Sequence, residues 1–323
     1  MAMTLAEYSK IAKDNLLGFI ADNFLMESDV AQRLPWETDK SLSVSMASMG
    51  TLPTVGWRNI NGSYSESTGK YDHKVESKYI FGHDIDVDVV LAKAGPTIID
   101  VRQGQRQMSA KAMAYEFNDV FINGNPEDKK FKGISKRIDD INTAGYTSQY
   151  IDGGSATIGR GFLYDSTDRQ YFLDNLNKLI HAMPAHKADA LYMNAKCYLA
   201  VESALRRENL LNTARDMFER EIKTYRGAAL IDIGVKADQT TEIITNAETL
   251  SGGSDETSIY AVRYGAGEFF WGIQQEPLSV RDLGELQTKP CFRDRVEWVT
   301  GLAYNNPRSL ARLYGLVADA GAS

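Results

Sequence analysis

The residues whose side chains most often carry catalysis or bind metals are few and scattered in this sequence. Four histidines and two cysteines are present: His73, His83, His181, His186, Cys197 and Cys291. His181 and His186 lie on either side of Pro184 and lack the spacing of a zinc-binding pair on a helix. Neither cysteine belongs to a CxxC pair, and Cys197 lies among apolar residues, which is typical of a packed, unreactive thiol. These residues therefore predict no zinc site and no disulfide framework.

Asp84, Asp86 and Asp88 form a row of carboxylates that could attract a hard cation such as Ca²⁺. They alternate with the apolar residues Ile85, Val87 and Val89. A period of two residues is typical of a half-buried strand. The Gly-containing loop and the terminal Glu of an EF-hand are missing, so the pattern favours a strand face that is solvated or salt-bridged.

A stretch around Gly154 approaches a phosphate-binding loop without matching it. The pattern requires Lys and then Ser or Thr after the last Gly, whereas Gly159 is followed here by Arg160 and Gly161. The sequence also lacks a G-x-S-x-G elbow, a dinucleotide-binding fingerprint and the kinase motifs. We therefore expect no catalytic, cofactor-binding or metal-binding residues, and a function other than catalysis.

The composition excludes several classes of protein. Among the 323 residues, 43% are apolar and 24% are charged, which is close to the globular average and excludes a wholly disordered chain or a coiled coil. The formal net charge of −7 argues against a basic nucleic-acid-binding domain. No apolar run reaches about 18 residues, so no membrane-spanning helix is expected.

Residues 4–26 are expected to form an amphipathic helix, because apolar residues recur there at steps of three and four. Thr4 and Glu7 have the spacing of a capping box. Charged residues interrupt the stretch, so it does not read as a signal peptide. The helix could dock on its own core or on a neighbouring subunit; binding to a membrane is less favoured, because its polar face is mixed in charge.

Residues 41–60 and 70–91 read as two extended stretches joined by a polar turn region that is rich in Gly and Ser. An isolated two-stranded ribbon is only marginally stable in water, and most of this one is too polar to build a core. It therefore needs a partner surface, either elsewhere in the chain or on another copy. Its candidate contact residues are Trp57, Lys70, Lys74 and Lys78.

A long helix is predicted over 96–123, because Pro96 is tolerated in a first turn and Gly124 is a good carboxyl-terminal cap. Such a helix would be about 40 Å long. Its predicted buried seam includes Met108, Ala112 and Tyr115. Arg102, Arg106 and Lys111 lie off that seam, facing solvent or the acidic residues of a neighbour. Arg102 and Arg106 complete the predicted inter-subunit contacts.

The rest of the chain is predicted to contain both helices and strands. Residues 125–161 read as loops, and an α+β or α/β lobe is expected over about 165–275. Helices are predicted over 167–183, 196–209 and 213–223, and strands over 190–193, 227–234, 241–245, 258–273 and 295–300.

This order of parts resembles the tailed-phage major capsid protein family, whose fold is called Hong Kong 97-like. Local phrases are also similar to members of that family: VFINGN at 120–125, FKGI at 131–134, ALYMNAKCY at 190–198, SIYAVRYG at 258–265 and RVEWVTGLAYNNPRSLARLYGL at 295–316. The resemblance covers nearly the whole chain and implies an α+β fold.

The resemblance implies how the chain is divided into domains. Residues 1–40 match the amino-terminal arm, 41–92 the extended β-hairpin called the E-loop, 93–164 and 276–323 the P domain with its spine helix at 96–123, and 165–275 the α/β A domain.

The resemblance further implies a coat protein that assembles with copies of itself, as pentamers and hexamers, into an icosahedral phage head around double-stranded DNA. The shell would be part of the virion and would be assembled in the host cytoplasm. About 40 residues precede the ribbon, so no fused scaffolding segment is expected. The expected partners are a separate scaffolding protein, a portal and packaged DNA that is not read by sequence, with no membrane.

Some members of the family join a ribbon lysine covalently to an asparagine of a neighbour. Lys70, Lys74 and Lys78 in the ribbon and Asn305-Asn306 near the end leave this open, but both residue types are common, so we do not expect it. Three other functions also remain open: an encapsulin-type nanocompartment shell, a cytoplasmic α/β enzyme with an unrecognised site, and a tail or decoration protein.

Overall fold

The computed structural model describes residue 24 and residues 27–93, 101–154, 161–163, 165–215 and 221–318. The predicted amphipathic helix over 4–26, apart from Phe24, lies outside the described residues. So do the first residues of the predicted long helix and the Gly159-Arg160 pair of the sequence that approaches a phosphate-binding loop.

One sheet is built around the long strand β13 (Cys291–Tyr304). Strand β4 (Tyr79–Asp88) pairs antiparallel along one edge of β13, from Cys291↔Asp88 to Thr300↔Tyr79. The other edge is shared by β12 (Ser279–Glu285) and then β11 (Phe270–Gln274), and β1 (Trp36–Thr38) pairs parallel with β11. Alternate residues of β13 point into the core, as the two-residue period in the sequence predicts.

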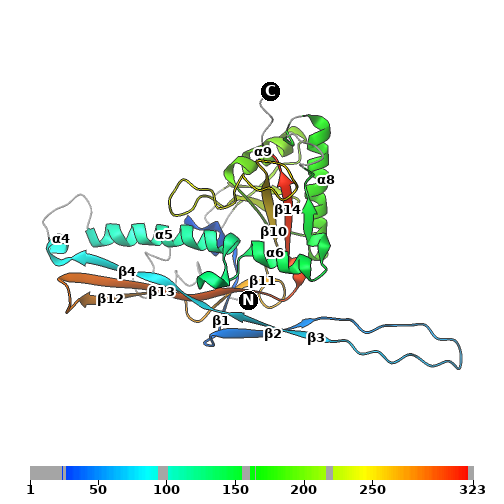
Figure 1. Ribbon diagram of the computed structural model, residues 1–323, viewed down its shortest axis with the longest axis horizontal. Helices are drawn as coiled ribbons and strands as arrows, with labels where there is room; N and C mark the ends of the chain where they lie inside the picture. The colour runs from blue at the N-terminus through cyan, green and yellow to red at the C-terminus, as the bar shows by residue number, and fades with distance from the viewer. Residues whose placement is uncertain are drawn as a thin grey trace.

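The long helix α5 (Val101–Asn123) lies along β4 and β13 (Figure 1). It ends as predicted, because the Gly124 N–H donates to the Val120 carbonyl at 2.8 Å and the chain then turns. The predicted buried seam is wrong over most of its length: Met108 and Ala112 are exposed, and the buried face carries Ala110, Ala114, Phe117 and Phe121. Ile122, which the predicted seam also included, is buried. The buried face is set by β4 and β13 along the helix and by the seven-stranded sheet at its end.

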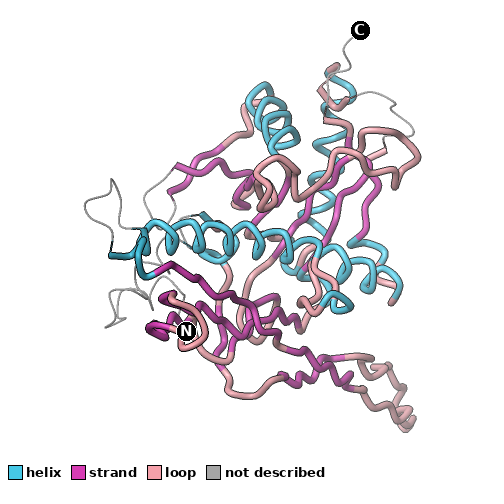
Figure 2. The backbone as a smooth tube through the Cα atoms, turned by 60° about the vertical axis from the view of Figure 1, so that its left-hand side comes forward, coloured by secondary structure: helices cyan, strands magenta, loops and turns pink. Residues whose placement is uncertain are grey.

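A second sheet has seven strands in the order β5-β14-β10-β6-β9-β8-β7. Their bounds are β5 Tyr150–Asp152, β14 Leu310–Leu316, β10 Thr257–Val262, β6 Ala190–Met193, β9 Ala228–Asp232, β8 Glu221–Tyr225 and β7 Asn212–Arg215. The helices α8 (Ser166–Ala182) and α9 (Ala195–Arg207) pack on one face, and α6 (Ile134–Thr143) and the end of α5 pack on the other (Figure 2). The central strands are buried on both faces, which explains their unbroken apolar composition.

The remaining elements are short, apart from one hairpin. The short helices are α3 Asp29–Arg33, α4 Val89–Lys93, and single turns at Pro126–Asp128, Thr147–Gln149, Pro184–His186 and Pro307–Ser309. The hairpin consists of β2 (Ser43–Met49) and β3 (Tyr71–Ser77), paired from Ser43↔Ser77 to Met49↔Tyr71. It projects from the body, and residues 50–70 form its tip (Figure 1).

Several predicted elements are wrong. Of the helix predicted over 213–223, residues 213–215 lie instead in β7 and 221–223 in β8, because strand pairing outweighs the local helix propensity; residues 216–220 lie outside the described part. Residues 241–245 form only an isolated bridge, between Val235 and Glu242. The strand predicted over 258–273 is two strands, β10 and β11, which lie in different sheets. The stretch 125–161, predicted as loops, contains the helix α6.

The core is joined under α5 by a cluster of aromatic rings. The Trp298 ring centroid is 4.7 Å from that of Trp36, 5.5 Å from that of Phe117 and 5.8 Å from that of Phe24. All four side chains are buried, and they come from four separate parts of the sequence. Burial of large aromatic side chains contributes strongly to folding, so this cluster fixes the helix on the sheet from which the hairpin emerges.

Candidate functional site

The residue types that most often carry chemistry are not brought together. Within the described ranges, no group of three or more His, Cys, Asp or Glu side chains is placed to hold a metal ion. Cys197 is fully buried, and burial raises the pKa of its thiol to about 12. His181 and His186 stack on each other with ring centroids 3.8 Å apart, at the surface. The described helices include none that is long and apolar enough to cross a bilayer.

The acidic row on β4 is salt-bridged. Arg295 Nε donates to Asp84 Oδ1 at 2.6 Å, and Arg293 Nε donates to Asp86 Oδ1 at 2.6 Å. Each arginine also donates a second hydrogen bond to the same carboxylate. These hydrogen bonds hold the pKa of both carboxyl groups below the usual range. The salt-bridged interpretation of the row is therefore correct for Asp84 and Asp86, whereas Asp88 Oδ1 accepts a hydrogen bond from the Val90 N–H at 2.8 Å.

Arg102 and Arg106 hold α5 on the same sheet. Arg102 Nη2 lies 2.7 Å from Asp294 Oδ1, and Arg106 Nε lies 2.8 Å from Asp294 Oδ2. The Asp294 side chain is buried on β13, and Arg102 also reaches Asp282 at 3.0 Å. Both arginines thus face acidic residues of their own chain. A contact between either of them and another copy stays a prediction.

The ribbon lysines differ in their surroundings. The Lys78 side chain is buried at the root of the hairpin, where Nζ donates to the carbonyl oxygens of Asp39 and Ser41. Lys74 Nζ lies 4.3 Å from the centre of the Tyr304 ring, and burial lowers the pKa of both Lys74 and Lys78. Lys70, in contrast, lies at the exposed tip.

The tip carries an exposed apolar surface. The Trp57 side chain is as accessible as in an extended peptide, at 104%. Four further large apolar residues of the tip are also exposed: Leu52, Val55, Ile60 and Tyr64. Exposed apolar patches of this kind mark interaction sites. Sequence reasoning named Trp57 but treated the tip as polar; the apolar residues spaced through 52–60 were the signal that it missed.

The root of the hairpin is fixed to the body by Arg137 of α6. Arg137 Nη2 donates to Glu76 Oε2 at 2.9 Å and to the Leu302 carbonyl at 2.9 Å, and Nη1 donates to the other oxygen of Glu76. The Arg137 side chain is 1% exposed. Sequence reasoning missed this anchor because it placed no helix at α6.

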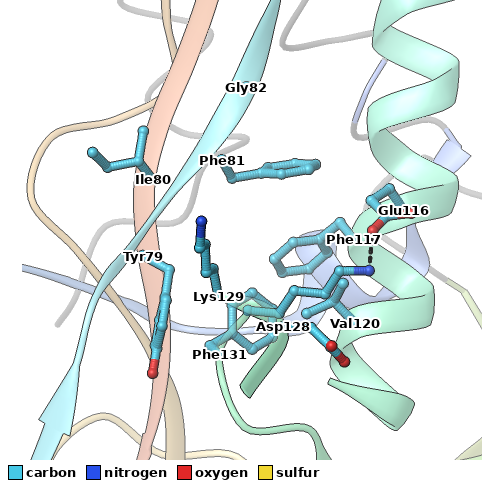
Figure 3. Close-up of a pocket in the computed structure, with 11 residues that line it drawn as sticks. Tyr79, Ile80, Phe81, Gly82, Glu116, Phe117, Val120, Asp128, Lys129 and Phe131 are labelled. Carbon is cyan, nitrogen blue, oxygen red and sulfur yellow. Dashed lines mark hydrogen bonds and ion pairs between the residues drawn. The ribbon is translucent and has the colours of Figure 1, made fainter. Parts of the chain in front are cut away.

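A pocket of about 220 Å³ opens beside the hairpin root, between β4, α5 and the loop after Asp128. Its lining is mainly aromatic and aliphatic: Tyr79, Ile80, Phe81, Phe117, Val120 and Phe131. Lys129 extends toward Ile80 and Phe81, while Lys130 is paired with Glu116 at one side (Figure 3). Four charged residues also line it, Glu116, Asp128, Lys129 and Lys130, so the pocket combines an apolar floor with a charged side.

Comparisons with known proteins concern the family and the fold of the chain. Residues 27–164 match the family model described as major capsid protein GP7. No curated protein sequence matches the chain. Among solved structures, an encapsulin complex from Synechococcus elongatus PCC 7942 is similar at 15% identity, with a TM-score of 0.61 over 98% of this chain and 97% of that chain.

A chain of a phage structure and a chain of a GTA capsid are similar to this chain to a comparable degree. A structure of Mycobacterium phage Bobi has 10% identity and a TM-score of 0.60 over 97% of this chain and 98% of that chain. The capsid of a native GTA particle has 14% identity and a TM-score of 0.57 over 90% of this chain and 89% of that chain. These findings establish the Hong Kong 97-like fold for this chain and confirm its resemblance to tailed-phage major capsid proteins.

Proposed function

We propose that this chain is the coat protein of a tailed-phage head, in which copies form pentamers and hexamers of an icosahedral shell around double-stranded DNA. The match of residues 27–164 to a major capsid protein model carries this proposal, because these residues include the hairpin and α5. The exposed apolar tip supports it, since exposed apolar patches are typical of surfaces that bind another molecule.

Within this proposal, residues 1–40 are the amino-terminal arm and 41–92 the E-loop. Residues 93–164 and 276–323 are the P domain, with α5 as its spine helix, and 165–275 are the A domain. The hairpin falls within 41–92, and most strands of the seven-stranded sheet fall within 165–275. Strands β5 and β14 belong to that sheet as well, so the P and A domains are interleaved rather than separate.

The proposed partners are further copies of the chain, a separate scaffolding protein, a portal and the packaged DNA. The net charge of −7 is compatible with a shell that encloses DNA without binding it tightly, because a basic inner wall would hold DNA and hinder its movement. The shell would belong to the virion and would be assembled in the host cytoplasm.

An encapsulin-type shell is the second candidate, and the similarity to the Synechococcus encapsulin complex favours it. The two candidates share a fold and differ in what the shell encloses. Neighbouring genes would separate them: terminase and portal genes indicate a phage head, whereas a gene for a cargo enzyme indicates an encapsulin.

Electron microscopy of the purified protein, with and without candidate scaffolding proteins, tests the shell itself. We expect closed, symmetric particles with fivefold vertices. A chain that stayed a compact monomer under every assembly condition would overturn both candidates and would favour an enzyme with an unrecognised site.

A further inference from the structure

The pocket beside the hairpin root has the size and lining of a site for one aromatic side chain. Its volume of about 220 Å³ is larger than the roughly 150 Å³ of an apolar cavity that binds benzene. Aromatic rings of Tyr79, Phe81, Phe117 and Phe131 form its walls. Edge-to-face contacts between aromatic rings add to the free energy gained from burial alone.

Lys129 gives the pocket a preference for an electron-rich ring. Its side chain extends across the pocket toward Ile80 and Phe81 (Figure 3). An ammonium group is attracted to the face of an aromatic ring, most strongly to that of tryptophan. Asp128 also lines the pocket, so a cation that follows the aromatic residue would meet an opposite charge.

The hairpin tip presents such a side chain. Trp57 is fully exposed and is followed by Arg58, whose guanidinium lies 5.3 Å from the Tyr64 ring in the tip. The other three tryptophans, Trp36, Trp271 and Trp298, are buried. Trp57 is therefore the one tryptophan of this chain that a partner could bury.

Trp57 cannot enter the pocket of its own chain. The pocket begins at Tyr79, just past the hairpin root, whereas Trp57 lies beyond the last pair of the hairpin, Met49↔Tyr71. The paired strands and the extended tip separate the two by an estimated distance of about 40 Å. Figure 1 shows the tip pointing away from the body. The occupant must come from a second copy.

We infer that Trp57 of one copy inserts into the pocket formed by Tyr79, Phe81, Phe117 and Phe131 of another copy, with Arg58 facing Asp128. This contact rests on the proposed shell function and assigns the site on the neighbour that receives the tip. It gives the protruding hairpin a fixed register on its neighbour, because one large side chain fits one pocket.

Tryptophan fluorescence with acrylamide as quencher tests the contact. In free subunits, Trp57 should account for the quenchable emission, and W57F should remove it. In assembled shells of the wild-type chain, quenching should fall to the level of W57F subunits. Shells in which Trp57 stays as quenchable as in free subunits would overturn the inference while leaving the shell function intact. Absence of any shells would instead count against the shell function.

Two variants that introduce arginine test whether Trp57 docks in this pocket. Ile80 lines its rim and is 74% exposed, and Val90 of α4 is 76% exposed and does not line it. I80R should keep Trp57 quenchable in shells or prevent assembly, whereas V90R should assemble and protect Trp57 as the wild type does. Protection of Trp57 in I80R shells would show that it docks elsewhere and would overturn the inference.

Discussion

At the scale of single residues, the structure uses its charged groups to join elements rather than to do chemistry. Arg137 is the clearest case, because its guanidinium is buried and donates to Glu76 on the hairpin and to the Leu302 carbonyl on β13. A buried charge is tolerated only when its hydrogen bonds are satisfied. The Glu76 carboxylate is therefore one of the contacts that hold the hairpin on the body, beside those of Lys74 and Lys78.

Replacing that carboxylate should loosen the hairpin. We expect E76A to lower the free energy of unfolding by about 1.5–3 kcal/mol, because it leaves the buried Arg137 without its charged acceptor. Denaturant unfolding measures the loss, and hydrogen exchange of residues 43–77 should rise. E66A, at an exposed tip position, is the matched control and should stay within about 0.5 kcal/mol of the wild type. An equal effect of both substitutions would contradict this role of Arg137.

His83 makes stability depend on pH in a defined direction. Its Nε2 lies 2.7 Å from Ser109 Oγ between β4 and α5, and burial lowers its pKa below the ordinary 6.5, although Asp84 acts in the opposite sense. Below pH 6.5 the unfolded chain therefore binds the proton more readily than the folded chain. Stability should fall as the pH drops from 6.5 toward the lower pKa of the folded state.

Chemical denaturation at a series of pH values measures this slope. H83Q should flatten it, because glutamine can still bond to Ser109 but does not titrate. H73Q, which changes an exposed histidine of β3, should retain the wild-type slope. Asp84 and Asp86 have pKa values below the ordinary 3.8, so the stability that their ionised forms contribute is lost as the pH falls through about 3.8 and lower. They therefore do not contribute to the slope near pH 6.5. A slope unchanged in H83Q would assign it to another group.

At the scale of elements, Gly82 decides how closely β4 can approach β13. A Cβ at this position would collide with the Val296 carbonyl oxygen, which is part of the backbone and cannot move away cheaply. We expect G82A to destabilise the subunit by about 1–3 kcal/mol. G56A is the control, since no atom lies within 4 Å of a Cβ at that tip position. Thermal unfolding of free subunits compares them, and a neutral G82A would argue against this close approach.

The sequence predicts elements well where local pattern and tertiary contact agree. The alternation of β13, the end of α5 at Gly124 and the buried strand β6 were all predicted because each carries its own periodicity or cap. The strands β7 and β8 were missed because the sequence 213–223 has no two-residue alternation, although β8 pairs with β9 across the short turn at Arg226-Gly227. The buried face of α5 was missed because contacts distant in sequence determine it, with β4 and with the seven-stranded sheet.

The candidate site also has a part that the sequence predicts and a part that it does not. Trp57 and Lys70 were predicted as contact residues because the ribbon sequence is too polar to fold alone; both are exposed, and their contact with another copy stays a prediction. The pocket combines β4, α5 and the loop at Lys129, and no local pattern brings these three segments together.

At the scale of the whole molecule, the hairpin tip is separable from folding. Residues 62–70 are all exposed, so their deletion removes no part of the core. We expect the deletion to change the free energy of unfolding of free subunits by less than about 0.6 kcal/mol, the scale of a change in loop length. Assembled shells should dissociate at lower temperature or denaturant concentration than wild-type shells. Loss of folded subunit would show that the tip has a role in folding.

The positions of β13 and β14 in the chain have a consequence for synthesis. Each is made after every strand with which it pairs: β4, β11 and β12 precede β13, and β5 and β10 precede β14. In the described part of the chain, β4 pairs with no strand other than β13. The sheet around β13 therefore stays incomplete on the ribosome until translation has passed residue 304, and the seven-stranded sheet until it has passed residue 316. In the proposed shell, a chain that ends before these strands would therefore have no finished surface for its neighbours.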